Sequence, residues 1–143
     1  MSNFSKRLVE LMVEQNLNAK ALAEKLCISH TSVGRFIRGE RTPSFQCFVK
    51  MLYFFNCSAD YLLGLTEFHT EETLHPIPAF KDSLRTMLNE RQVTQAQLIA
   101  TLSLSSAVPY KWLTGINEPS MNSLISLAEY FECSVDYLIG RIK

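Results

Sequence analysis

The sequence predicts an all-α chain made of two copies of one five-helix unit in tandem. Apolar residues recur three and four positions apart along most of the chain, which is the period of a helix with one buried face. Small polar residues precede these stretches and glycines follow several of them, as expected at helix ends. The whole order then recurs after 76 residues without a gap. Strand signals are absent, since polar and apolar residues do not alternate and neither Asn-Gly nor Asp-Gly occurs.

The first helix is predicted over residues 4–15, with Ser2 or Asn3 as its N-cap. Four apolar positions share one face of this helix, namely Phe4, Leu8, Leu11 and Met12. Ser44 is expected to cap a fourth helix over residues 45–55. Ser58 is expected to cap a short fifth helix over residues 59–63, which Gly64 closes.

Between these helices, residues 18–43 predict two short helices joined by a tight turn. Asn18 can cap the first of them, and Ser29 can cap the second after a turn at residues 27–29. The second helix is expected over residues 30–38 and ends at Gly39, where a glycine tolerates positive φ. Two short helices joined in this way form a helix-turn-helix motif.

The second copy begins near Phe80, which matches Phe4. The closing segments agree most closely, because residues 57–64 and 133–140 both read Cys-Ser-x-Asp-Tyr-Leu-x-Gly. Residues 66–78 between the copies contain two prolines and three glutamates without helical periodicity, so they are expected to form a linker. The predicted domains are therefore residues 1–65 and 79–143.

Both units resemble the helix-turn-helix domain of phage repressors, the lambda-repressor-like or XRE family. In unit one the resemblance rests on L-N-x-x-x-L-A-x-x-L-x-I-S-x-x-x-V-x-x-x-x-x-G over residues 17–39. In unit two it rests on V-T-Q-x-x-L at residues 93–98, L-S at 104–105 and W-L-x-G at 112–115. Pro-Ser follows in both units, at residues 43–44 and 119–120.

The resemblance implies a sequence-specific DNA-binding transcriptional regulator, most simply a repressor that inserts helix 30–38 into the major groove of double-stranded DNA. The outward residues of this helix are candidates for base reading: His30, Thr31, Gly34 and Arg35. Candidates for phosphate binding are Asn18, Lys20, Ser29, Ser32, Arg38 and Arg41. Ala19 departs from the glutamine that the family often has at this position, so one contact is lost there.

Charge separates the two copies. Residues 1–65 carry eight basic and five acidic side chains, residues 66–79 carry three glutamates, and residues 80–143 carry six of each sign. Because phosphate neutralisation supplies most non-specific affinity, the basic first unit is the better candidate for DNA binding.

The second unit has weaker candidates, which are Thr94, Gln95, Ser106, Ala107, Tyr110 and Lys111. Its reading helix is predicted from Ser105 to Thr114, with Pro109 near the fourth position removing one backbone hydrogen bond. Two hypotheses remain open for this unit. It is a weak second DNA reader, or its surface serves dimerisation or another partner.

Other function classes find little support in the sequence. No metal-ligand spacing, phosphate-binding glycine loop or nucleophile–base pair occurs, so we expect no enzyme, no cofactor and no metal. The four cysteines are expected to be reduced and mostly buried, in a cytoplasmic protein without a membrane span. A homodimer is one arrangement that the resemblance allows, and no small-molecule effector is evident. The alternative function is a protein-interaction module of the antitoxin or antirepressor type.

Overall fold

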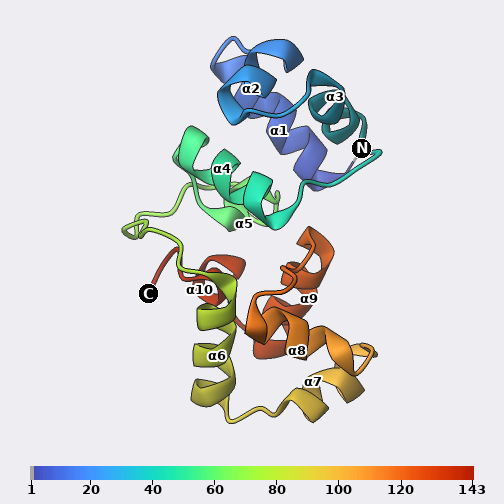
Figure 1. The fold of residues 1–143 in the computed structure, drawn as a ribbon. Helices are drawn as coiled ribbons and strands as arrows, with labels where there is room; N and C mark the ends of the chain where they lie inside the picture. Colours follow the sequence, from blue (N-terminus) through green and yellow to red (C-terminus); the bar gives the residue numbers. More distant parts are fainter. Residues whose placement is uncertain (1) are drawn as a thin grey trace. The chain divides into compact units, whose positions relative to one another are not determined.

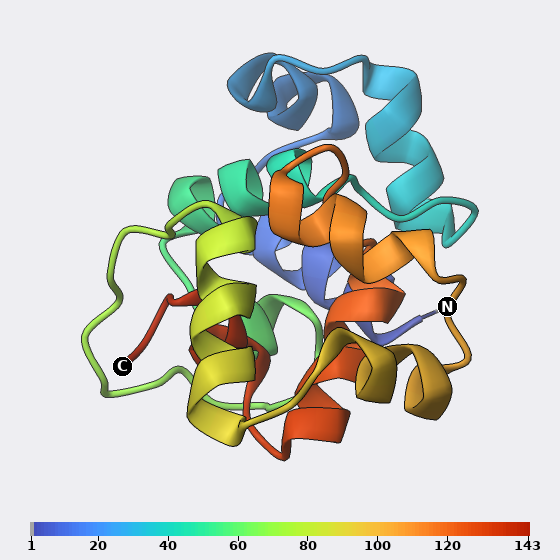
Figure 2. The same cartoon turned by 60° about the horizontal axis from the view of Figure 1, so that its bottom comes forward.

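The computed structural model describes residues 2–143, and within them every regular element is a helix. The helices fall into two groups in chain order (Figure 1 and Figure 2). The first group comprises α1 (Asn3–Glu14), α2 (Ala19–Leu26), α3 (His30–Arg38), α4 (Phe45–Phe55) and α5 (Ala59–Leu62). The second comprises α6 (Phe80–Arg91), α7 (Gln95–Leu102), α8 (Ala107–Thr114), α9 (Met121–Phe131) and α10 (Val135–Ile139). The predicted all-α fold with two five-helix units is therefore confirmed, and none of these helices is long and apolar enough to cross a membrane.

Side-chain caps explain where most helices begin. In unit one every helix has an N-cap whose side-chain oxygen accepts a hydrogen bond from the backbone N–H three residues later; these caps are Ser2, Asn18, Ser29, Ser44 and Ser58. In unit two, α7, α9 and α10 have such caps, at Thr94, Ser120 and Ser134. Helices α6 and α8 lack one, so α8, the counterpart of α3, has a weaker start.

The two cores are built from matched positions. Leu8, Leu22 and Phe48 are fully buried in unit one, and Leu84, Leu98 and Leu124 are fully buried 76 residues later. Trp112 replaces Phe36 and is likewise buried, with its ring edge-to-face against Phe80 at 6.3 Å between centroids. The repeat in the sequence is therefore a repeat of the buried scaffold.

The first helix of each unit holds the end of the third helix of that unit. In unit one the buried Ser5 hydroxyl on α1 donates to the Phe36 carbonyl in the last turn of α3, at 2.7 Å. In unit two Arg85 Nη2 on α6 donates to the Leu113 carbonyl near the end of α8, at 3.3 Å. These bonds support carbonyls in the last turn, where the helix has no further N–H to offer, and the Phe36 carbonyl also accepts from the Gly39 N–H at 3.2 Å.

A glycine allows the last helix of each unit to approach the first. Gly64 has φ +73°, and a Cβ built there would lie 2.7 Å from the Cβ of Asn3. Gly140 has φ +83°, and its Cβ would lie 2.8 Å from a ring carbon of Pro78. Neither the conformation nor the space suits another residue, so these glycines fix the closure of each unit.

The segment predicted as a linker is attached at both of its ends. Glu67 forms an ion pair with Arg7, and the His69 ring stacks on Tyr61 with centroids 4.0 Å apart. At the other end, His75 exchanges hydrogen bonds with Arg141. The boundary between the two compact units lies between Thr73 and Leu74, so each end of this segment belongs to the unit that it contacts.

The prediction that the cysteines are mostly buried is confirmed for only two of the four. Cys47 and Cys57 are buried, whereas Cys27 is exposed and Cys133 is half-buried, and none of the four forms a disulfide. Cys27 is exposed because it ends α2 in the left-handed conformation, with φ 56°. Burial raises the pKa of the Cys47 thiol, which keeps it protonated and unreactive.

Two glycine variants test the closure of unit one. Gly64→Ala and Gly39→Ala both force alanine to φ +73°, but a Cβ at Gly39 meets no atom closer than 3.6 Å. We expect Gly39→Ala to cost about 1–2 kcal/mol from backbone strain alone. Gly64→Ala should cost a further 1–3 kcal/mol or so, because the alanine clashes with Asn3. Amide hydrogen exchange in α4 measures both losses, and equal losses would show that the close approach relaxes freely.

Candidate nucleic-acid interface

The two-helix motif of unit one has the predicted geometry. α2 ends at Cys27, the chain turns through Ile28, and Ser29 in extended conformation begins α3. Val33 and Phe36 bury one face of α3 within the unit, where α3 packs on α1 and α2. The opposite face bears the exposed side chains of His30, Thr31 and Arg35, with Gly34 half-buried between them. This is the outward set predicted to read bases.

The predicted phosphate ligands at the helix starts are also helix caps. Asn18 Oδ1 accepts from the Ala21 N–H at 2.8 Å, and Ser29 Oγ accepts from the Ser32 N–H at 3.2 Å. The hydroxyls of Ser29 and Ser32 lie 2.9 Å apart. The first turns of α2 and α3 therefore combine oriented N–H groups with small polar side chains, an arrangement that favours anions.

The side chain of Arg38, a predicted phosphate ligand, is paired with a carboxylate of the same unit. Its guanidinium makes two hydrogen bonds to the Glu40 carboxylate, from Nε and Nη2, each 3.1 Å long. The same side chain folds back over α3, and a Cβ added to Gly34 would lie 3.0 Å from Arg38 Nη1. The hydrogen bond from Arg38 lowers the pKa of Glu40, so the carboxylate stays charged beside the outward face of α3. Sequence reasoning missed this pair, although the Arg-x-Glu spacing at the helix end is its signal.

The basic charge of unit one is distributed unevenly. Lys20, Arg35 and Arg41 are exposed, whereas Arg7 is 4 % exposed and is held by carboxylates and backbone carbonyls. Lys50 Nζ donates to the Leu26 carbonyl at 3.4 Å and so supports the end of α2. The charge that faces outward around α3 therefore comes from fewer residues than the sequence count implied.

In unit two the start of the corresponding helix was predicted wrongly. α8 begins at Ala107 rather than Ser105, and its N-cap Ser106 makes no side-chain hydrogen bond. Pro109 is the third residue of the helix and has no N–H to give to a serine cap. Because N–H groups in the first turn have no partner within the helix, the proline removes no helical hydrogen bond, contrary to our prediction.

The outward face of α8 also differs in chemistry from that of α3. Tyr110 is 56 % exposed where unit one has Gly34, and Ile116 is 63 % exposed where unit one has Glu40. Lys111 is exposed and stands at the position of Arg35. Ser106, Ala107 and Gln95 are exposed as well. The surface keeps one basic residue and gains apolar area.

Thr94 of unit two has a structural role. Its hydroxyl accepts from the Gln97 N–H at 3.2 Å, and the Gln97 side chain accepts from the Thr94 N–H at 2.8 Å. This reciprocal capping box fixes the start of α7 and leaves Gln95 outside the bonded pair. Among residues 2–143, no group of three or more His, Cys, Asp or Glu side chains could hold a metal ion.

Comparison with known families agrees with this geometry. A family profile described as "Helix-turn-helix" matches residues 8–62, and one described as "Cro/C1-type HTH DNA-binding domain" matches residues 83–143. No curated protein and no solved structure matches the chain significantly. The two profiles together cover both predicted units.

The two helix starts offer a matched test of capping. We expect Ser29→Ala to destabilise unit one by about 1 kcal/mol, because the Ser32 N–H loses its acceptor. Ser106→Ala should leave unit two nearly unchanged, because Ser106 has no cap bond to lose. Urea unfolding followed by Trp112 fluorescence reports on unit two, and amide hydrogen exchange in α3 reports on unit one. A loss at Ser106 as large as that at Ser29 would contradict the described start of α8.

Proposed function

Because the chain belongs to the XRE family of Cro/C1-type helix-turn-helix DNA-binding proteins, with two such domains in tandem, we propose that it is a transcriptional repressor whose α3 reads operator DNA. Unit one is the principal reader. It inserts α3 into the major groove and represses by occupying the operator, without enzymatic chemistry.

The exposed basic face of α3 carries this proposal. Arg35 lies at its centre, and guanine O6 and N7 are the usual targets of an arginine in the major groove. His30, Thr31 and Gly34 lie on the same face. Asn18, Lys20, Ser29, Ser32, Arg38 and Arg41 are the proposed phosphate ligands. Base contacts then specify the sequence, while the phosphate contacts set the register.

A second role is favoured for unit two by its exposed apolar side chains. Tyr110 and Ile116 occupy the face that is polar and charged in unit one, and interfaces between proteins are enriched in tyrosine. We propose that this face contacts protein, either a second copy or another partner. Weak DNA contact through Gln95 and Lys111 is the competing proposal. Binding-site selection from random DNA with the full chain separates them, because a second half-site of different sequence is recovered only if unit two reads DNA, whereas a dimer joined through unit two repeats the half-site of unit one.

Arginine variants test the role of α3. Arg35→Ala should lower affinity for the selected site about tenfold or more and relax the preference at one base pair. Arg41→Ala should weaken binding to all sequences alike and reduce the slope of log affinity against log salt by about 1. Lys6→Ala removes the same charge from the exposed face of α1 that bears Glu10 and Glu14, so it is the matched control. Fluorescence anisotropy over a salt series measures all three, and unchanged binding in both arginine variants would refute the proposal.

The ion pair of Arg38 leads to a separate prediction. Glu40 holds the guanidinium and also places a negative charge near the DNA backbone. Glu40→Gln should therefore raise affinity by about threefold at low salt, with a smaller gain at high salt where charges are screened. In the Arg38→Ala background Glu40→Gln should raise affinity by less, because only the repulsion by Glu40 remains to be removed. A gain of equal size in both backgrounds would show that Glu40 acts by repulsion alone.

A further inference from the structure

Unit two contains a groove away from the helix-turn-helix face. It has a volume of about 540 Å³ and lies between α6, α10 and the incoming residues 75–78. Its walls include the apolar side chains of Pro78, Met87, Leu138 and Ile142. Its polar groups include the carboxylates of Asp82 and Glu90 on α6 and the phenol of Tyr137 on α10. None of the proposed DNA contacts uses this groove.

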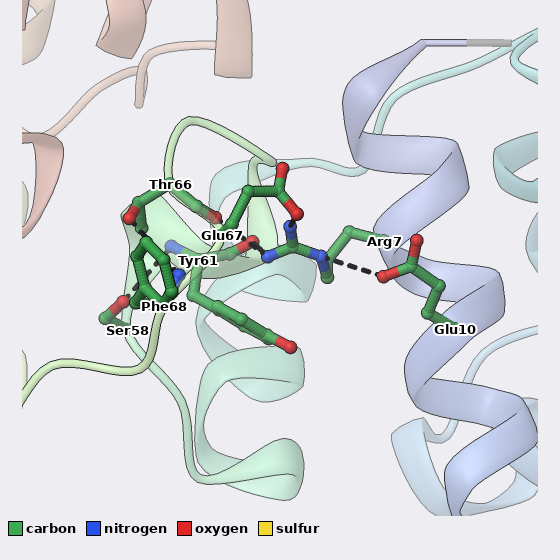
Figure 3. Close-up of polar contacts among 7 residues, drawn as sticks. All are labelled: Arg7, Glu10, Ser58, Tyr61, Thr66, Glu67 and Phe68. Carbon is green, nitrogen blue, oxygen red and sulfur yellow. Dashed lines mark hydrogen bonds and ion pairs between the residues drawn. The ribbon is translucent and has the colours of Figure 1, made fainter.

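The corresponding place in unit one is filled by an arginine of the chain itself. Figure 3 shows Arg7 reaching from α1 toward Tyr61, Thr66 and Glu67. Its Nη1 donates to the carbonyls of Tyr61 and Thr66, and its other nitrogens pair with Glu10 and Glu67, both at 3.2 Å. The guanidinium carbon lies 3.9 Å from the centroid of the Tyr61 ring, a cation–π contact. Unit one therefore uses a buried guanidinium to complete this face.

The 76-residue repeat identifies what unit two lacks. Ser83 stands at the position of Arg7, and its short side chain donates to the Ile139 carbonyl at 3.2 Å. Tyr137 stands at the position of Tyr61, and Leu138 and Gly140 match Leu62 and Gly64. The platform is retained, whereas the group that occupies it in unit one is replaced by a serine.

The charges around the groove suit a cation. Asp82 and Glu90 lie on the exposed face of α6, where unit one has Lys6 and Glu14. The Tyr137 hydroxyl donates to Glu90 Oε2 at 2.9 Å, and this bond raises the pKa of the phenol. Lys143 also lines the groove, at the position of Glu67. The bond from Tyr137 to Glu90 fixes a carboxylate beside an aromatic ring, the pair that a guanidinium recognises.

We propose that the groove of unit two binds a guanidinium group on an aliphatic chain, the chemistry of an arginine side chain supplied by a small molecule. The guanidinium stacks on Tyr137 and forms hydrogen bonds with Glu90 or Asp82. The aliphatic stem lies against Met87, Leu138 and Ile142. A ligand bound there also contacts Pro76 and Pro78, so it touches the segment that enters unit two from the spacer.

A set of three probes tests this proposal on the full chain. N-acetylarginine amide carries the guanidinium, N-acetyllysine amide carries an ammonium, and N-acetylcitrulline amide is a neutral isostere of the first. Backbone amide chemical shifts of Glu90, Tyr137, Leu138 and Gly140 are followed during titration. We expect a dissociation constant of about 1 mM for the arginine probe, as is typical of so small a ligand. The lysine probe should bind severalfold more weakly, and the citrulline probe should not bind measurably.

Variants of the groove provide the second arm. Ser83→Arg introduces the residue that unit one has at this position, so it should fill the groove and abolish binding of the arginine probe. Ser83→Ala keeps the space open and should retain binding. Glu90→Gln keeps an acceptor for Tyr137 but removes the charge, and should weaken binding about fivefold or more.

Several outcomes would overturn the proposal. Equal chemical-shift changes with the arginine and citrulline probes would show that the groove does not recognise the charged guanidinium. Chemical-shift changes confined to residues outside the groove would show that the probe binds elsewhere. Unchanged binding in Glu90→Gln would show that this carboxylate is not part of a binding site. If Trp112 fluorescence shows that Ser83→Arg does not fold, the comparison with the citrulline probe and the Glu90→Gln variant still test whether the groove binds a guanidinium. Loss of DNA binding by unit one has no bearing on any of these results.

Discussion

The hydrogen bond from Ser5 to the Phe36 carbonyl fixes α3 of unit one to α1. The bond is buried and 2.7 Å long, and it joins residues 31 positions apart. Burial of Val33 and Phe36 sets which face of α3 is inward, while this bond holds the last turn of α3 against α1. The outward residues then follow from helical geometry alone, so the position of Arg35 depends on contacts made on the opposite side of the helix.

Local signals in the sequence were enough for most of the fold. Serine, threonine and asparagine caps mark helix starts because their side chains bond to the backbone only three residues away, as at Asn18 and Ser44. The burial of Arg7 was not predictable in this way, because its partners Tyr61 and Thr66 are 54 and 59 residues distant. The start of α8 was misplaced because matching the repeats gave Ser105 the role of Ser29, while Pro109 changed which N–H groups were present. For the interface, the outward set on α3 followed from periodicity. The pairing of Arg38 with Glu40 was missed because the Arg-x-Glu spacing permits this contact without fixing the rotamers that form it.

The two copies show which parts of the unit are free to change. Buried leucines, helix caps and closing glycines recur at equal spacing, because each is required by packing or by backbone conformation. The exposed faces of the two units differ in charge and in apolar area. Unit one bears arginines around α3, whereas unit two bears Tyr110 and Ile116 around α8. Arg7 occupies the place in unit one that corresponds to the open groove of unit two. Two surfaces have therefore changed chemistry on one retained scaffold.

The stacking of Tyr61 has a consequence for how unit one can be separated from the rest of the chain. The guanidinium of Arg7 and the ring of His69 lie 3.9 Å and 4.0 Å from the same ring centroid, and both fit only if they cover opposite faces. Residues up to His69 are thus part of the folded surface, although the helices end at Leu62. A fragment cut at Leu65 would expose one face of Tyr61 and would deprive Arg7 of both Thr66 and Glu67. The smallest fragment of unit one with a complete surface therefore ends no earlier than His69.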